Sequence, residues 1–74
     1  MIIQLNGSPY QCIDSETLQD LVGELKLDIR KLAIEINLEI IPRSGYSSYI
    51  LSDGDQVEIV HFIGGGSYTS EEYR

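Results

Sequence analysis

A single amphipathic segment with β-prone segments on both sides most constrains the fold of this chain. Its apolar residues Leu18, Leu21, Val22 and Leu25 follow the i, i+3, i+4, i+7 spacing that places four side chains on one helical face. Thr17, directly before them, is a favourable N-cap residue. The pattern therefore predicts one helix from residue 18 to about residue 26, whose apolar face must pack against a sheet.

The other apolar segments are short, β-prone and bounded by turn signals: residues 2–5, 10–13, 32–37, 40–41 and 57–62. Asn6-Gly7 predicts a hairpin before the helix, and Leu38-Glu39 is the expected turn of a second hairpin after it. Residues 43–49 are polar and are expected to be irregular, although they could hold a single helical turn that the periodicity does not require. This order predicts an α+β fold with one main helix packed across a mixed sheet of four to five strands.

Composition narrows the class of function. At 74 residues the chain has room for one small domain, so a deep active site and a free-standing enzyme are not expected. Its net charge of −7 argues against nucleic acid and anionic membranes as partners. Without a signal peptide, a transmembrane-length segment or a second cysteine, a cytoplasmic location is the simplest expectation.

Few side chains are candidates for chemistry. Cys12 is expected to be a packed hydrophobe, because lone cysteines in strands usually are. His61 has no nucleophile or carboxylate spaced with it to suggest a relay, and the scattered carboxylates predict no metal site.

The last predicted strand runs directly into Ile63, Gly64, Gly65 and Gly66, which we call the glycine arm. Glycines leave a backbone without side chains, which can enter a narrow enzyme channel or serve only as a flexible linker. We expect residues 1–63 to form the domain, residues 64–66 a flexible reactive arm, and residues 67–74 a disordered extension that processing can remove.

Several segments in the same order resemble the ThiS family of sulfur carriers. They are Leu5-Asn6-Gly7, residues 17–21, 34–37, 40–43 and 51–55, and the strand with its glycine arm, residues 57–66. The last segment, with its spacing from Asp53-Gly54-Asp55, is the most specific.

The resemblance implies a ubiquitin-like β-grasp fold and a protein co-substrate that binds no cofactor itself. In this family the C-terminal glycine, here Gly66 with Gly65 as the alternative, is adenylated with ATP by an E1-like enzyme, ThiF. Sulfur from cysteine, released by a desulfurase, gives a thiocarboxylate, and the thiazole synthase ThiG accepts the sulfur. Two alternatives stay open: a carrier for another pathway such as molybdopterin synthesis, and a ubiquitin-like interaction module without sulfur chemistry.

The expected partner-binding residues surround the arm. Val60 and Phe62 alternate onto one strand face and predict an apolar docking patch that continues into Ile63, Gly64 and Gly65. The chain departs from the family by continuing for eight residues after Gly66, whose carbonyl is then an amide. Three explanations stay open: the tail is removed after Gly66, the chain is a precursor, or it is not a working carrier. Of these we favour removal of the tail after Gly66 before adenylation.

Overall fold

The computed structural model describes residues 1–62 and 68–72. The strands are β1 (Ile2–Leu5), β2 (Ser8–Gln11), β3 (Leu32–Ile36), β4 (Glu39–Ile41), β5 (Gln56–Phe62) and β6 (Tyr68–Glu72). The helix is α1 (Leu18–Glu24), and short 3-10 turns cover Ile29–Lys31 and Arg43–Gly45.

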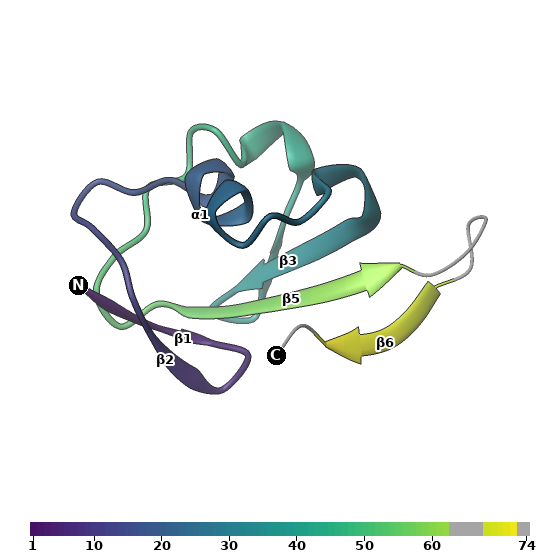
Figure 1. Cartoon of the computed structure of the whole chain (residues 1–74), viewed down its shortest axis with the longest axis horizontal. Helices are drawn as coiled ribbons and strands as arrows, with labels where there is room; N and C mark the ends of the chain where they lie inside the picture. The colour runs from purple at the N-terminus through teal and green to yellow at the C-terminus, as the bar shows by residue number, and fades with distance from the viewer. Residues whose placement is uncertain (63–67, 73–74) are drawn as a thin grey trace.

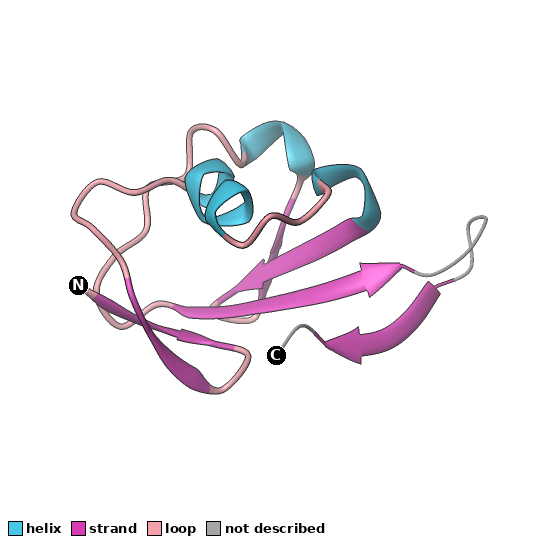
Figure 2. Ribbon diagram, in the orientation of Figure 1, coloured by secondary structure: helices cyan, strands magenta, loops and turns pink. Residues whose placement is uncertain are grey.

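The strands form one mixed sheet in the order β2-β1-β5-β3-β4, with β6 added on β5. The first and last strands of the domain, β1 and β5, are parallel, and the other pairs are antiparallel. Helix α1 lies across one face of the sheet, while the opposite face, which we call the outer face, has no helix over it in the described part of the chain (Figure 1; Figure 2). This confirms the predicted β-grasp arrangement.

Helix α1 begins as the sequence predicts. The Thr17 hydroxyl accepts from the Asp20 N–H at 3.1 Å, and the Asp20 carboxylate accepts from the Thr17 N–H at 3.1 Å, which forms a capping box. The helix ends at Glu24, earlier than predicted, because Lys26 adopts a left-handed φ of 58° that an α-helix cannot continue through.

The first hairpin turns at Asn6-Gly7 as predicted, but β2 starts earlier than predicted. Both turn residues have positive φ, 48° and 82°, so Leu5 pairs with Ser8 immediately after the turn. Pro9 is tolerated inside β2 because that strand is at the sheet edge. Residue 13, which we assigned to the strand, lies beyond its end.

The second hairpin turns one residue earlier than predicted. Asn37 and Leu38 have positive φ, 51° and 71°, and Glu39 already pairs with Ile36 as the first residue of β4. The two-residue turn shifts the boundary because Asn37, assigned to the strand on its alternation pattern, readily adopts the left-handed conformation.

The segment after the glycine arm also differs from the expectation of a disordered extension. Its residues Tyr68–Glu72 form strand β6, which pairs antiparallel with the end of β5. Composition favoured disorder because the segment is short and polar, whereas the exposed edge of β5 offers backbone partners that composition does not reveal.

Candidate functional site at the end of strand β5

Strand β5 is the central strand that leads into the glycine arm. Its side chains Val57 and Ile59 are fully buried against the helix side of the sheet. Five consecutive register pairs, from Leu32 with His61 to Ile36 with Val57, join it to β3. The arm therefore begins at the end of a strand fixed by the core.

Asn6 extends the contact between β1 and β5 beyond the last residue of β1. Its backbone N–H donates to the Val57 carbonyl at 2.8 Å. Its side-chain amide then continues along β5: Oδ1 accepts from the Ile59 N–H at 2.8 Å and Nδ2 donates to the Ile59 carbonyl at 3.3 Å. The Asn6 side chain thus makes the two hydrogen bonds that the backbone of a further β1 residue would make with Ile59. The turn signal predicted the reversal at Asn6 but not this long-range role.

The start of β5 is held by the buried carboxylate of Asp55. It accepts from Asn37 Nδ2 at 3.0 Å, from the Tyr49 hydroxyl at 3.2 Å and from the Ser52 N–H at 2.9 Å. The Asn37 side chain also accepts from the Gln56 N–H at 2.9 Å. Burial raises the pKa of Tyr49, and the nearby Asp55 charge raises it further. This network joins the second hairpin to the first residue of β5.

The outer face of the sheet carries a shallow hollow of about 410 Å³, which we call the outer hollow. Its floor includes Ala33 and Val60, which are register partners on β3 and β5. Glu35 and Glu58, a second register pair, give it an acidic side. Val60 therefore lies on the outer face, as the alternation along β5 predicts.

Phe62 lines a different hollow, of about 250 Å³, at the end of β5. Arg30 and Arg43 also line this end hollow, so its charge is opposite to that of the outer hollow. Ala33 lines both hollows, whereas Val60 lines only the outer hollow and Phe62 only the end hollow. The two residues expected to form one patch therefore contribute to two adjoining hollows of opposite charge.

Two apolar side chains at the rim of the outer hollow are unusually exposed. Leu38 is 89% exposed and Ile40 is 71% exposed. Leu38 also adopts a left-handed φ of 71°, which costs a bulky residue about 1 kcal/mol relative to glycine. A strained and exposed leucine contributes nothing to the core, so its position points to a surface role. The sequence indicated this residue only as part of a turn.

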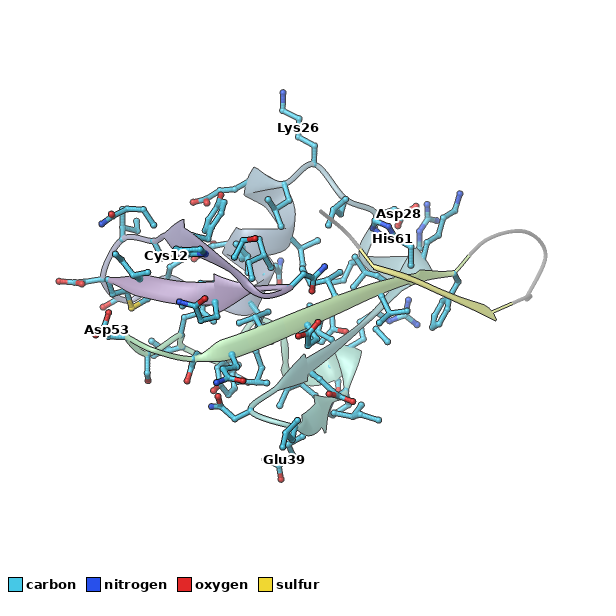
Figure 3. The ribbon with its side chains drawn as sticks, turned by 90° about the horizontal axis from the view of Figure 1, so that it is seen from below. Cys12, Lys26, Asp28, Glu39, Asp53 and His61 are labelled. Carbon is cyan, nitrogen blue, oxygen red and sulfur yellow. The ribbon has the colours of Figure 1, made fainter. Side chains whose placement is uncertain are left out.

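Cys12 and His61 are the two side chains that the sequence raised as candidates for chemistry. Cys12 is buried, and burial raises the pKa of its thiol to about 11, with the Glu16 charge adding to the effect. This confirms the expectation of a packed cysteine. His61 lies on β5 where β6 runs beside it (Figure 3). Over residues 1–62, no three His, Cys, Asp or Glu side chains are grouped to hold a metal ion.

The glycine arm itself, Ile63, Gly64, Gly65 and Gly66, lies outside the described residues. The structure thus defines the strand that carries the arm and the two hollows beside that strand. In the described part of the chain, no helix has the length and apolar character needed to cross a membrane.

Comparison with known proteins identifies the family. The ThiS family model matches residues 3–66, which is most of the chain and ends with the last residue of the arm. The chain belongs to the ThiS family. It is 41% identical over 66 residues to the sulfur carrier protein ThiS of Bacillus subtilis, covering 88% of this chain and all of that protein.

A solved ThiS structure and a longer relative extend the comparison. The crystal structure of the thiamine biosynthesis protein ThiS from Geobacter metallireducens matches with a TM-score of 0.78 and 30% identity, covering 89% of this chain and all of that one. A thiazole synthase from Paramagnetospirillum magneticum is 45% identical over 73 residues, which is 99% of this chain and 22% of that enzyme. The chain thus spans about a fifth of that relative's length, and the match continues past the arm.

Proposed function

We propose that this chain is a sulfur carrier of thiamine biosynthesis and that the carboxylate of Gly66 is its reactive group. The match to the full length of a 66-residue ThiS carries this proposal, because it covers the β-grasp domain together with the glycine arm. The chain is a co-substrate in this scheme, and the enzymes that act on it supply the catalytic groups.

The chemistry requires a free carboxylate on the arm. On an E1-like enzyme of the ThiF type, the Gly66 carboxylate attacks the α-phosphate of ATP and releases pyrophosphate. A persulfide supplied by a cysteine desulfurase then displaces AMP and forms an acyl disulfide with Gly66. A thiol reductant cleaves the S–S bond of this acyl disulfide, which leaves the thiocarboxylate on Gly66 and a disulfide on the donor side. A thiazole synthase then takes up this sulfur. The similarity of this chain to part of the thiazole synthase of Paramagnetospirillum magneticum supports the proposal that such an enzyme is its partner.

Eight residues follow Gly66, so hydrolysis of the Gly66–Ser67 peptide bond must come first. The test compares chains ending at Gly66 and at Ser67, each incubated with a ThiF-type enzyme, ATP, a persulfide donor and a thiol reductant. Intact mass should show replacement of one oxygen by sulfur only on the Gly66-ended chain. Sulfur on the Ser67-ended chain, or on neither, would refute the assignment of Gly66.

The outer hollow is our proposed docking site for the adenylating enzyme. Val60 and the exposed Leu38 and Ile40 supply apolar contacts, and Glu35 and Glu58 match a basic partner surface. The end hollow, with Phe62, lies where the arm leaves the sheet and continues this surface toward Ile63, Gly64 and Gly65.

Two substitutions of equal exposure test the docking site. Ile40 and Ile13 are both 71% exposed, but only Ile40 lines the outer hollow. We expect Ile40→Ser to weaken binding to the adenylating enzyme about tenfold, since an apolar anchor contributes on the order of 1.4 kcal/mol. Ile13→Ser should leave binding unchanged. Equal effects of the two substitutions would exclude the outer hollow as the interface.

Leu38→Gly provides a second test in which stability and binding change in opposite directions. Removing the left-handed strain should stabilise the fold by up to about 1 kcal/mol, while loss of the exposed side chain should weaken docking. A variant that is both more stable and equally well bound would show that Leu38 has no part in the interface.

A further inference from the structure

Three different parts of the chain pair with one edge of β5 along its length. Strand β1 pairs with it at Gln56 and Val57. The Asn6 side chain takes the next position, at Ile59. Strand β6 then pairs at Val60 and Phe62, on the far side of the chain from β3.

The backbone groups that face this edge follow the two-residue period of a strand. The Val57 carbonyl and the N–H and carbonyl of Ile59 are bonded by Asn6. The next residue in this series is His61. It lies between the two β5 residues that β6 pairs with, so β6 runs along the last stretch of edge before the glycine arm (Figure 3).

The pairing of β5 with β6 is weaker than its pairing with β3. Strand β3 makes five uninterrupted register pairs. Strand β6 has two, Val60 with Glu72 and Phe62 with Tyr68, and a register shift separates them. A short ladder interrupted by a bulge is easily exchanged, and an edge without it is a template for another extended segment.

From this geometry we infer that the β5 edge at residues 60–62 is a strand-acceptor site, which Tyr68–Glu72 fills within the same chain. An extended segment of the enzyme that receives the arm takes the place of β6 by strand addition. Strand β6 is then a self-masking strand that covers the edge until the tail is displaced or cleaved.

The register explains why masking affects the arm. Pairing of Phe62 with Tyr68 places both ends of the intervening segment opposite each other at the sheet edge. An arm that leaves the sheet as a single extended strand requires β6 to detach. The masking role rests on the proposed carrier function, whereas the acceptor site itself rests only on the edge of β5.

Amide hydrogen exchange tests whether β6 occupies the edge. The full chain is compared with a chain ending at Gly66 and with the full-length double variant Thr69→Pro/Glu71→Pro, since proline cannot donate to a ladder. The matched control is Thr69→Ala/Glu71→Ala. We expect the His61 amide to exchange at least tenfold faster in the shortened chain and the proline variant. The Ile59 amide, bonded by Asn6, should change less than twofold and reports that the fold is intact.

Binding to a purified ThiF-type adenylating enzyme tests strand exchange. The proline variant should bind at least fivefold more tightly than the alanine control, because β6 no longer competes. Equal His61 exchange in all four chains, or equal enzyme binding by the two variants, overturns the proposal. Failure of the proposed function would give a different result. The chain ending at Gly66 would form no adenylate, while its His61 amide would still exchange faster than in the full chain.

Discussion

The buried carboxyl of Glu16 makes the stability of this protein depend on pH in a direction that can be tested. Glu16 is 1% exposed, and its Oε1 accepts from the Ile13 N–H at 3.2 Å. Its second oxygen, Oε2, is buried and has no hydrogen-bond partner among the described residues. Burial raises the pKa of Glu16; the Ile13 N–H opposes the shift, and the charge of Glu24 adds to it.

The sign of the effect follows from the raised pKa. The folded state holds the Glu16 proton more tightly than the unfolded chain does, so this group stabilises the fold at pH values below its unfolded pKa. That contribution is lost as pH rises through the folded pKa, and at pH 8 the buried charge is a cost. Glu16→Gln keeps the acceptor for Ile13 and removes the charge. We expect it to raise the free energy of unfolding by about 1 kcal/mol at pH 8, which corresponds to roughly 4–8 °C in Tm.

Urea denaturation at pH 8 and pH 4 measures the effect, with Glu39→Gln as the control. Glu39 is an exposed carboxyl on β4 and lies at the margin of the sheet (Figure 3). Its substitution should change stability by less than about 0.5 kcal/mol at either pH. The gain from Glu16→Gln should be present at pH 8 and shrink toward zero at pH 4. A Glu16→Gln protein no more stable than the parent at pH 8, or a gain equal at both pH values, would refute this reasoning.

Three further predictions concern Asn6, Asp55 and Cys12. Asn6→Ala removes both side-chain hydrogen bonds to Ile59 and should lower the free energy of unfolding by about 2 kcal/mol in urea titrations; a loss below about 0.5 kcal/mol would show that the amide does not support β5. Asp55→Ala should lower the free energy of unfolding by about 3 kcal/mol and Tyr49→Phe by only about 1 kcal/mol, because the carboxylate accepts three hydrogen bonds and the hydroxyl donates one of them. Equal losses from the two substitutions would contradict the network. With its pKa raised from 9.0 to about 11, Cys12 should react with an aromatic disulfide at pH 8 about 100-fold more slowly in the native than in the urea-unfolded protein, and similar rates would contradict its burial.

Features encoded within a few residues could be predicted from the sequence. The capping box joins Thr17 to Asp20, three positions away, and the Asn6-Gly7 turn depends on the φ preferences of those two residues. The parallel pairing of β1 with β5 could not be derived from the order of the strands along the chain, because that order alone does not establish which strands are neighbours. Boundaries were less accurate, because one left-handed residue such as Lys26 or Asn37 moves the end of an element.

Interactions between distant segments could not be predicted in this way. The polar segment 43–49 was expected to be irregular, and nothing in its composition indicated that Tyr46 is buried in the core. Asn6 bonds Ile59 across 53 positions, and composition alone classed the tail as disordered although an edge of β5 was available to it. Each case depends on which backbone groups the completed sheet leaves open, and that information appears only when β5 is placed between β1 and β3.

The pairing of β5 with its neighbours also explains how the domain presents its arm. Strand β5 is buried at Val57 and Ile59, joined to β3 over its length, and held at its start by Asp55 and along its other edge by Asn6. These contacts end near His61, one position before the last residue of the strand. A carrier needs this combination, because a rigid base fixes the direction of the arm while a lightly paired end leaves the arm available to an enzyme. The place where the ladder on β5 weakens is therefore the place where partner proteins have most to gain by adding contacts.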